Sequence, residues 1–173
     1  MKIVVVPSTL ALLPEYAGLE DPIAELRAAV AEAVAWLPAG PVSVLTADAS
    51  PAAKRIATTL LGDRTALPYD PEDRGLLVVA NGTATRTEKA PGHLDERAEA
   101  FDAGLRAALA TGDPEALALT DPELGAALWC PDAAAFVGLG RTTAETTVTS
   151  ARIDYDDVPY GVQYWVVRWQ CRP

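Results

Sequence analysis

The chain contains one histidine, His93, and two cysteines, Cys130 and Cys171. A non-haem iron site of the common facial type needs two histidines and a carboxylate, and hydrolytic zinc sites commonly use two or three histidines. Neither ligand set can be built from His93 alone, so the sequence predicts no metal and no cofactor. An imidazole titrates near neutral pH, which makes His93 a candidate general base. Its position just before a predicted helix is, however, more typical of an exposed or capping side chain.

Small polar side chains follow three apolar segments that are typical of strands. Ser8 and Thr9 follow the first segment, Asp48 follows the second, and Asn81 and Thr83 follow the third. In an open α/β sheet, ligands bind at the carboxyl ends of the strands, so these residues define a candidate cleft. Their hydroxyl, amide and carboxylate groups suit hydrogen bonding to a small polar molecule. The alternative is structural, because the same side chains also close turns and cap helices.

A serine hydrolase is a weaker interpretation of this cleft. Ser8, His93 and Asp48 form a triad on paper. Ser8 nevertheless lacks the glycine-flanked turn that exposes the nucleophile of a hydrolase. We therefore keep these three residues only as weak catalytic candidates.

Three further groups have a functional and a structural interpretation. Glu88-Lys89 and Arg86 could bind an anion, although exposed charged side chains are usually only solvated surface. Tyr160 and Trp165 could line a pocket, whereas the tryptophans in general are expected to pack in the core or at its edge. The acidic side chains at 154–157 could collect a cation, but their sequence is typical of an ordinary turn.

The first half of the chain alternates strand and helix patterns. Three short segments rich in aliphatic and β-branched residues predict buried strands, and these are 2–6, 42–46 and 75–80. Apolar residues at helical spacing predict two helices, one capped by Asp21-Pro22 and one by Ser50-Pro51. The polar segment 62–74 contains two prolines and predicts a loop. This order indicates an α/β fold.

The second half begins with a loop. Residues 81–92 show no hydrophobic period, and long loops of this kind often carry function. A helix is predicted from Asp95 to Gly112, and short helices are predicted to start at Asp113 and Asp121. β-forming residues on either side of a turn near 156–159 predict two strands that pair or lie in one sheet. Residues 1–173 thus form a single α/β domain, a sandwich whose mixed, mostly parallel sheet of about five strands is flanked by helices.

Charge and composition exclude several function classes. The net charge of −10 repels nucleic acid and anionic membranes, and no segment approaches the ~18 apolar residues of a membrane span. Two cysteines are too few for a disulfide scaffold, so a cytoplasmic location with buried, inert thiols is expected. The partner is then a small-molecule ligand or another protein, and homo-oligomer formation stays open. An acidic interaction module that meets a basic protein is one such alternative.

Several segments together resemble a known family. They are the run 81–98, Phe101-Asp102, Gly112-Asp113-Pro114, and 155–162 with Tyr164. These segments resemble the small bacterial proteins of the class III extradiol ring-cleavage dioxygenase-like family, and more distantly the Memo proteins. The resemblance implies an α/β fold with a cleft at the strand ends, where the true enzymes hold ferrous iron on two histidines and a glutamate and split catechol rings with dioxygen.

The chain departs from this family at the iron ligands. Ser8 stands where the family has its opening histidine, and His93 falls where the family commonly has tyrosine. A serine hydroxyl does not replace an imidazole on iron. We therefore expect a metal-free relative that keeps the cleft and has lost ring cleavage. The alternative is an enzyme that uses His93 for metal-independent acid-base chemistry, or residual oxidoreductase chemistry, on a small aromatic or carbonyl substrate.

Overall fold

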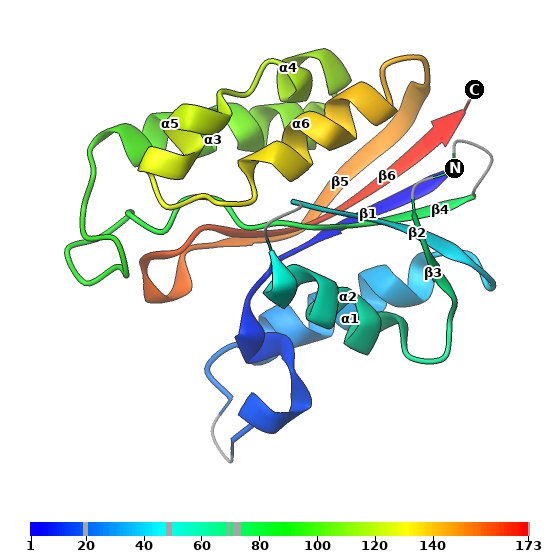
Figure 1. Ribbon diagram of the computed structural model, residues 1–173, viewed down its shortest axis with the longest axis horizontal. Helices are drawn as coiled ribbons and strands as arrows, with labels where there is room; N and C mark the ends of the chain where they lie inside the picture. The colour runs from blue at the N-terminus through cyan, green and yellow to red at the C-terminus, as the bar shows by residue number, and fades with distance from the viewer. Residues whose placement is uncertain (19–20, 48–49, 69, 71–73, 173) are drawn as a thin grey trace.

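A mixed six-stranded sheet forms the centre of the protein (Figure 1). The computed structural model describes residues 1–18, 21–47, 50–68, 70 and 74–172. The strands are β1 (Lys2–Val6), β2 (Val42–Thr46), β3 (Ala66–Leu67), β4 (Gly75–Val79), β5 (Thr147–Asp157) and β6 (Tyr164–Arg172). Their order is β3-β2-β4-β1-β6-β5, in which β1 to β4 are parallel, β6 is antiparallel to β1, and β5 is antiparallel to β6.

Helices cover both faces of this sheet (Figure 1). The helices are α1 (Ala24–Trp36), α2 (Pro51–Leu61), α3 (Arg97–Thr111), α4 (Pro114–Ala118), α5 (Pro122–Ala127) and α6 (Ala133–Thr142), with short 3-10 turns η1 (Leu10–Leu12), η2 (Pro14–Tyr16) and η3 (Pro159–Gly161). Helices α1 and α2 pack on one face, and α3, α4 and α6 pack on the other. Strand β1 belongs to both cores, because Val4 and Val6 point to one face while Ile3 and Val5 point to the other.

The predicted α/β fold is confirmed, with local differences. The sheet has six strands rather than about five, because Ala66–Leu67 pairs with β2 inside a segment predicted to be a loop. Helix α1 begins at Ala24, and Asp21 accepts a hydrogen bond from the Ile23 N–H instead of standing directly before the helix. Helix α6 was not predicted at all, since Gly138 and Gly140 are poor helix formers within a short segment.

Other sequence signals act as expected. The Ser50 hydroxyl accepts a hydrogen bond from Ala53 N at the start of α2, and Asp113 and Asp121 cap α4 and α5 in the same way. Gly112 ends α3 in the left-handed conformation, where a side chain would be strained. The predicted pairing of the last two strands is also confirmed, as β5 and β6 form an antiparallel pair.

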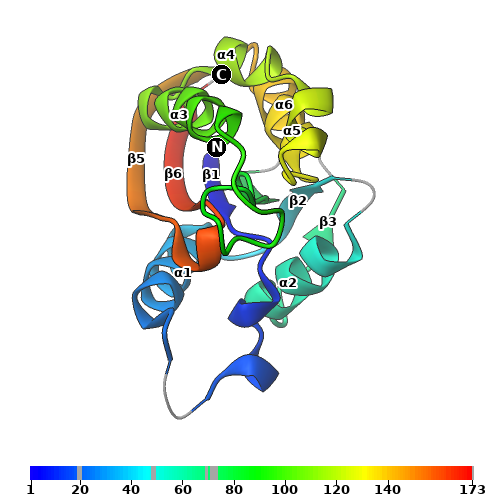
Figure 2. The same cartoon turned by 90° about the vertical axis from the view of Figure 1, so that its left-hand side faces the viewer.

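The topology places a switch point at the carboxyl ends of the neighbouring strands β1 and β4. The chain leaves β1 towards α1 on one face, whereas it leaves the neighbouring β4 towards α3 on the other face. Figure 2 looks onto this end, with the green loop after β4 and the orange-red turn before β6 facing the viewer. Divergence of this kind is where ligands bind in open α/β sheets. Among the described residues, no helix is both long and apolar enough to cross a membrane.

Candidate functional site

Three distant segments meet at the carboxyl end of the sheet. Ser8 follows β1, Asn81 follows β4, and Asp132 stands immediately before α6. The Ser8 N–H donates to Asn81 Oδ1 at 2.8 Å, and the Asn81 N–H donates to Asp132 Oδ2 at 3.3 Å. The Ser8 hydroxyl donates a short hydrogen bond to the same Asp132 oxygen. These contacts fix the two strand ends against the start of the helix.

Asp132 is a buried carboxylate with one unpaired oxygen. The residue is 1% exposed, and its Oδ1 has no hydrogen-bond partner in the described part of the chain. Burial raises the pKa of Asp132 above its ordinary value, because the charged form loses its water. Hydrogen bonds from the Ser8 side chain and the Asn81 backbone to Oδ2, together with the nearby Ser50 hydroxyl, oppose this rise in pKa. Buried unpaired oxygens are rare in proteins, so Asp132 is a functional candidate.

The free energy of unfolding is expected to fall less with rising pH in Asp132→Asn than in the parent protein. A carboxyl group with a higher pKa in the folded than in the unfolded protein holds its proton longer when folded, so the free energy of unfolding falls as pH rises from about 4. Asparagine does not titrate, and the variant should lose this contribution, which is about 1.4 kcal/mol for each unit of pKa difference. Urea unfolding at about pH 4.5 and about pH 7.5 measures the slope. Glu99→Gln, at an exposed position of α3, is the control, and equal slopes in parent and Asp132→Asn would contradict the expectation.

A pocket of about 450 Å³ opens beside this cluster. Its walls come from the loop after β4, the segment between α5 and α6, and the start of β6. The lining residues are Asn81, Ala84, Ala126, Trp129, Pro131, Val162 and Tyr164. Strand β6 is antiparallel to β1, so its first residues lie at the carboxyl end of β1. The volume lies within the range of small-molecule sites.

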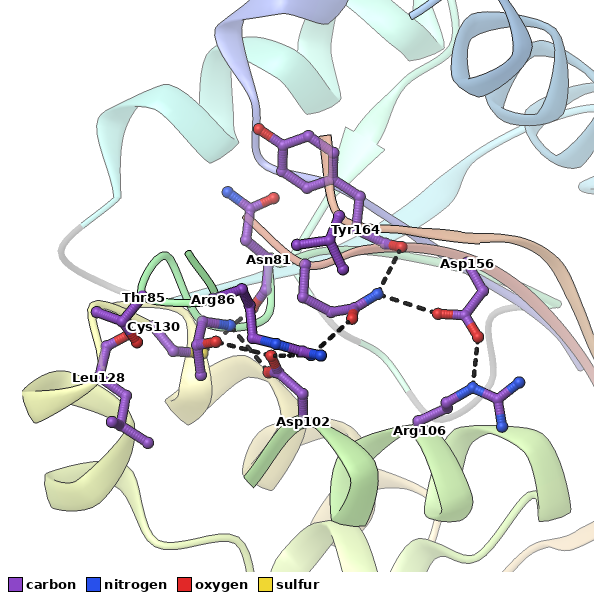
Figure 3. A network of polar contacts seen from close by, with 12 residues as sticks. Asn81, Thr85, Arg86, Asp102, Arg106, Leu128, Cys130, Asp156 and Tyr164 are labelled. Atoms are coloured by element: carbon purple, nitrogen blue, oxygen red, sulfur yellow. Dashed lines mark hydrogen bonds and ion pairs between the residues drawn. The ribbon is translucent and has the colours of Figure 1, made fainter. Parts of the chain in front are cut away.

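The pocket contains two polar side chains, Asn81 and Tyr164. Figure 3 shows the Asn81 amide and the Tyr164 ring on the same side of a polar network. Burial raises the pKa of Tyr164 above its ordinary value, while hydrogen bonding to the Thr9 side chain opposes the rise. A tyrosine hydroxyl whose pKa is raised stays neutral at physiological pH and carries one proton that it can donate.

Trp129 forms an exposed wall of the pocket. Its backbone has a φ of 55°, in the left-handed region that a bulky residue rarely adopts, and its side chain is 55% exposed. Gly92 lies directly beneath, and a Cβ there would come within 2.8 Å of Trp129 Cγ. His93 and Tyr160 also have positive φ in neighbouring loops. Strained backbone of this kind concentrates at functional sites.

An ion pair between the buried Asp102 and the partly exposed Arg86 holds the loop that begins at Asn81. Asp102 on α3 accepts hydrogen bonds from Thr83 N at 3.0 Å, Thr83 Oγ1 at 2.7 Å and Arg86 Nη1 at 3.1 Å (Figure 3). Burial raises the pKa of Asp102, and the Thr83 and Arg86 hydrogen bonds oppose that rise. Arg86 Nη1 also donates to Gln163 Oε1 at 3.1 Å, which ties the loop to the segment before β6.

The network continues to the surface through Gln163. Gln163 Nε2 donates to Asp156 Oδ1 at 3.0 Å, and Asp156 forms an ion pair with Arg106 of α3 (Figure 3). Gly82 makes the close packing feasible, because a Cβ there would lie 2.7 Å from Gln163 Cβ and 2.8 Å from Asp102 Oδ1. The long loop is therefore fastened on both sides instead of lying free.

The structure brings some of the residues selected from sequence together and separates others. Ser8 and Asn81 are in direct contact, and Thr9 lies beside the pocket through its contact with Tyr164. Thr83 is fully buried against Asp102 and does not line the pocket. Asp48 lies outside the described residues.

Three selected residues lie on the surface. His93 and Lys89 are exposed, and His93 Nδ1 lies 3.4 Å from the Glu88 carbonyl oxygen rather than against Ser8. Tyr160 is 55% exposed and does not line the pocket. The acidic side chains at 154–157 include two that pair with arginines, Asp154 with Arg152 and Arg168, and Asp156 with Arg106.

Sequence reasoning missed Trp129, Asp132 and Tyr164 as site residues. The expectation that the tryptophans pack in the core or at its edge is confirmed for Trp165 and Trp169 in the core and for Trp36 at its edge, whereas Trp129 is 55% exposed. Trp165 is 1% exposed and stacks edge-on against Phe136, so it does not line the pocket. The sequence signal for Asp132 is an acidic residue directly before a helix, and the two glycines of α6 obscure the helical pattern that would reveal it. The expectation of buried thiols is confirmed for both cysteines, and burial raises the pKa of each.

The residues at the strand ends do not fit the iron site that the family resemblance implies. A serine hydroxyl, an asparagine amide and one carboxylate meet there, whereas that site needs two imidazoles and a carboxylate. Within the described ranges, no three His, Cys, Asp or Glu side chains gather as a metal site would require. Neither a scan against protein-family models nor a search of the curated proteins finds a match to this chain.

Proposed function

We propose that this chain is a small-molecule-binding domain, related to the class III extradiol dioxygenase-like proteins, that has no iron-dependent ring cleavage. The observation that carries the proposal is the pocket between the segment after β4, the α5–α6 segment and the start of β6, with Asn81 and Tyr164 inside apolar walls. A mostly apolar cavity with a few convergent polar groups is the usual form of a ligand site. The strained Trp129 and the unpaired Asp132 oxygen beside it add support.

The geometry favours this function over acid-base catalysis by His93. The imidazole is exposed and is not among the side chains that line the pocket. A general base must come within hydrogen-bond reach of the proton that it removes. A ligand in the pocket would contact Asn81, Tyr164 and Trp129 instead.

Trp129→Ala is expected to weaken ligand binding at least about tenfold, because truncating an aromatic wall removes its buried contact area. A panel of small ring compounds is screened by NMR for shifts at the methyl groups of Ala84, Ala126 and Val162, and the affinity of each hit is measured in parent and variant. Tyr16→Ala is the matched control, because Tyr16 is also 55% exposed but lies in η2, outside the pocket.

Two results would overturn the proposal. A panel without hits at the pocket methyl groups would remove the binding function. Stoichiometric ferrous iron together with oxygen-dependent opening of a catechol ring would restore the dioxygenase chemistry. His93→Ala separates the catalytic alternative, since loss of a turnover activity in that variant with ligand affinity retained would favour His93 catalysis.

A further inference from the structure

We infer that the ligand of the pocket is an uncharged ring compound with a carbonyl group, whose oxygen accepts hydrogen bonds from the Asn81 amide and the Tyr164 hydroxyl. The inference rests on the proposed binding function and adds the chemical class of the ligand. Asn81 and Tyr164 each offer a hydrogen-bond donor to the pocket, and the other lining side chains are apolar.

The Asn81 side chain is oriented so that it offers a donor. Its Oδ1 accepts a hydrogen bond from the Ser8 N–H at 2.8 Å, which places the oxygen against β1 and fixes which end of the amide is which. Its Nδ2 donates to no described residue, although Asn81 lines the pocket. An amide NH₂ group has two donors and no acceptor, so the ligand atom that meets it must be an acceptor.

Tyr164 supplies the second polar group on the same side. Its ring lines the same pocket as Asn81, and in Figure 3 both side chains extend to the same side of the polar network. A tyrosine hydroxyl is protonated at physiological pH, and burial raises the pKa of Tyr164 further. The hydrogen bond with the Thr9 side chain lowers the pKa, as a donor to the phenol oxygen does, so the hydroxyl proton can be donated to a ligand oxygen. A carbonyl oxygen has two lone pairs and can accept from both side chains at once.

The remaining wall excludes charge from the ligand. No lining residue is ionisable at neutral pH, and the other side chains are aliphatic, proline or tryptophan. An ion moved into such surroundings loses its hydration without gaining a counter-charge. An anion would in addition approach a chain with a net charge of −10. A neutral acceptor avoids both penalties.

The shape of the wall selects a ring. Trp129 contributes a broad, exposed indole. Its backbone conformation directs the ring, and Gly92 leaves room for the ring because it has no side chain. Aromatic pairs prefer offset or edge-to-face contact and add stabilisation beyond the area that they bury. Ala84, Ala126 and Val162 complete an apolar surface around it.

Three naphthalene probes of similar size test the class by calorimetry. They are 2-acetylnaphthalene, which has a neutral carbonyl, 2-isopropenylnaphthalene, in which a CH₂ group replaces that oxygen, and 2-naphthoate, which is an anion. The ketone is expected to bind roughly 3- to 10-fold more tightly than the alkene, as a net neutral hydrogen bond contributes. The naphthoate is expected to bind at least about tenfold more weakly than the ketone.

Two variants assign the hydrogen bonds. Tyr164→Phe removes only the hydroxyl, and Asn81→Asp keeps the acceptor for the Ser8 N–H while replacing the donor by a carboxylate oxygen. Each is expected to lower the ratio of ketone affinity to alkene affinity relative to the parent protein. Tyr155→Phe is the matched control, because the Tyr155 hydroxyl contacts Asp157 outside the pocket. A general change in pocket shape alters ketone and alkene affinity alike, so the ratio of the two affinities reports the hydrogen bond alone.

The outcomes separate this inference from the proposed function. Binding of alkene or naphthoate as tight as that of the ketone would overturn the carbonyl class and leave small-molecule binding intact. A ketone preference that survives in both variants would overturn the roles of Asn81 and Tyr164. Failure of all three probes would overturn the ligand class, and the broader panel of ring compounds then decides whether the binding function also fails.

Discussion

Asp102→Ala is expected to lower the free energy of unfolding by about 3–5 kcal/mol, the range for removing one partner of a buried ion pair. Asp102 is 1% exposed and accepts from the Thr83 backbone, the Thr83 hydroxyl and Arg86. Its removal leaves buried donors without an acceptor and a guanidinium without its counter-charge. Urea unfolding followed by circular dichroism at pH 7 measures the change.

The same substitution should disturb the pocket, because the network anchors the loop that begins at Asn81. In a stabilising buffer where the variant stays folded, NMR shifts of Ala84 and Val162 are expected to move. Arg106→Ala is the control at the solvent end of the same network, where the ion pair with Asp156 is exposed and contributes about 0–1 kcal/mol. Equal losses of stability in the two variants would show that the buried end has no special role.

Gly140→Ala is expected to lower the free energy of unfolding by about 3 kcal/mol, at the upper end of the usual range for overpacking. A Cβ at Gly140 would lie 2.4 Å from both Ala118 N and Pro114 O, so it would strike the backbone of α4 rather than a side chain that could move. Helix α6 must then shift away from α4. Because Asp132 stands at the start of α6, affinity for pocket ligands should fall as well.

Gly104→Ala is the matched control for this prediction. Gly104 lies in α3, and no atom lies within 4 Å of the place that an added Cβ would take, so alanine there should raise stability by about 0.5–1 kcal/mol through helix propensity. Thermal and urea unfolding of both variants give the comparison. A destabilisation of similar size at both positions would contradict close backbone packing as the cause at Gly140.

Much of the fold could be predicted from the sequence because its signals are local. The alternation of buried side chains in β1, the capping residues Ser50, Asp113 and Asp121, and the glycine after α3 each act within a few residues. Such signals mark where elements begin and end. They failed for α6 and β3, where the helix contains glycines and the strand has only two residues.

The candidate site was only partly predictable. Ser8 and Asn81 could be predicted to lie together, because each follows a strand and parallel neighbouring strands end at the same edge of a sheet. The sequence did not indicate that Asp132, 124 residues from Ser8 and 51 from Asn81, would join them. It also did not indicate that Trp129 would be exposed, because tryptophan is usually found packed.

The sequence by itself determined the α/β class, the alternation of strands and helices, and a set of ligand types too poor in histidine for the usual iron and zinc sites. Tertiary structure alone decided which polar groups face a pocket. That decision depends on the antiparallel insertion of β6 beside β1 and on the close approach of α4 and α6. Both arise from packing between segments far apart in the chain, where no local pattern of residues carries the information.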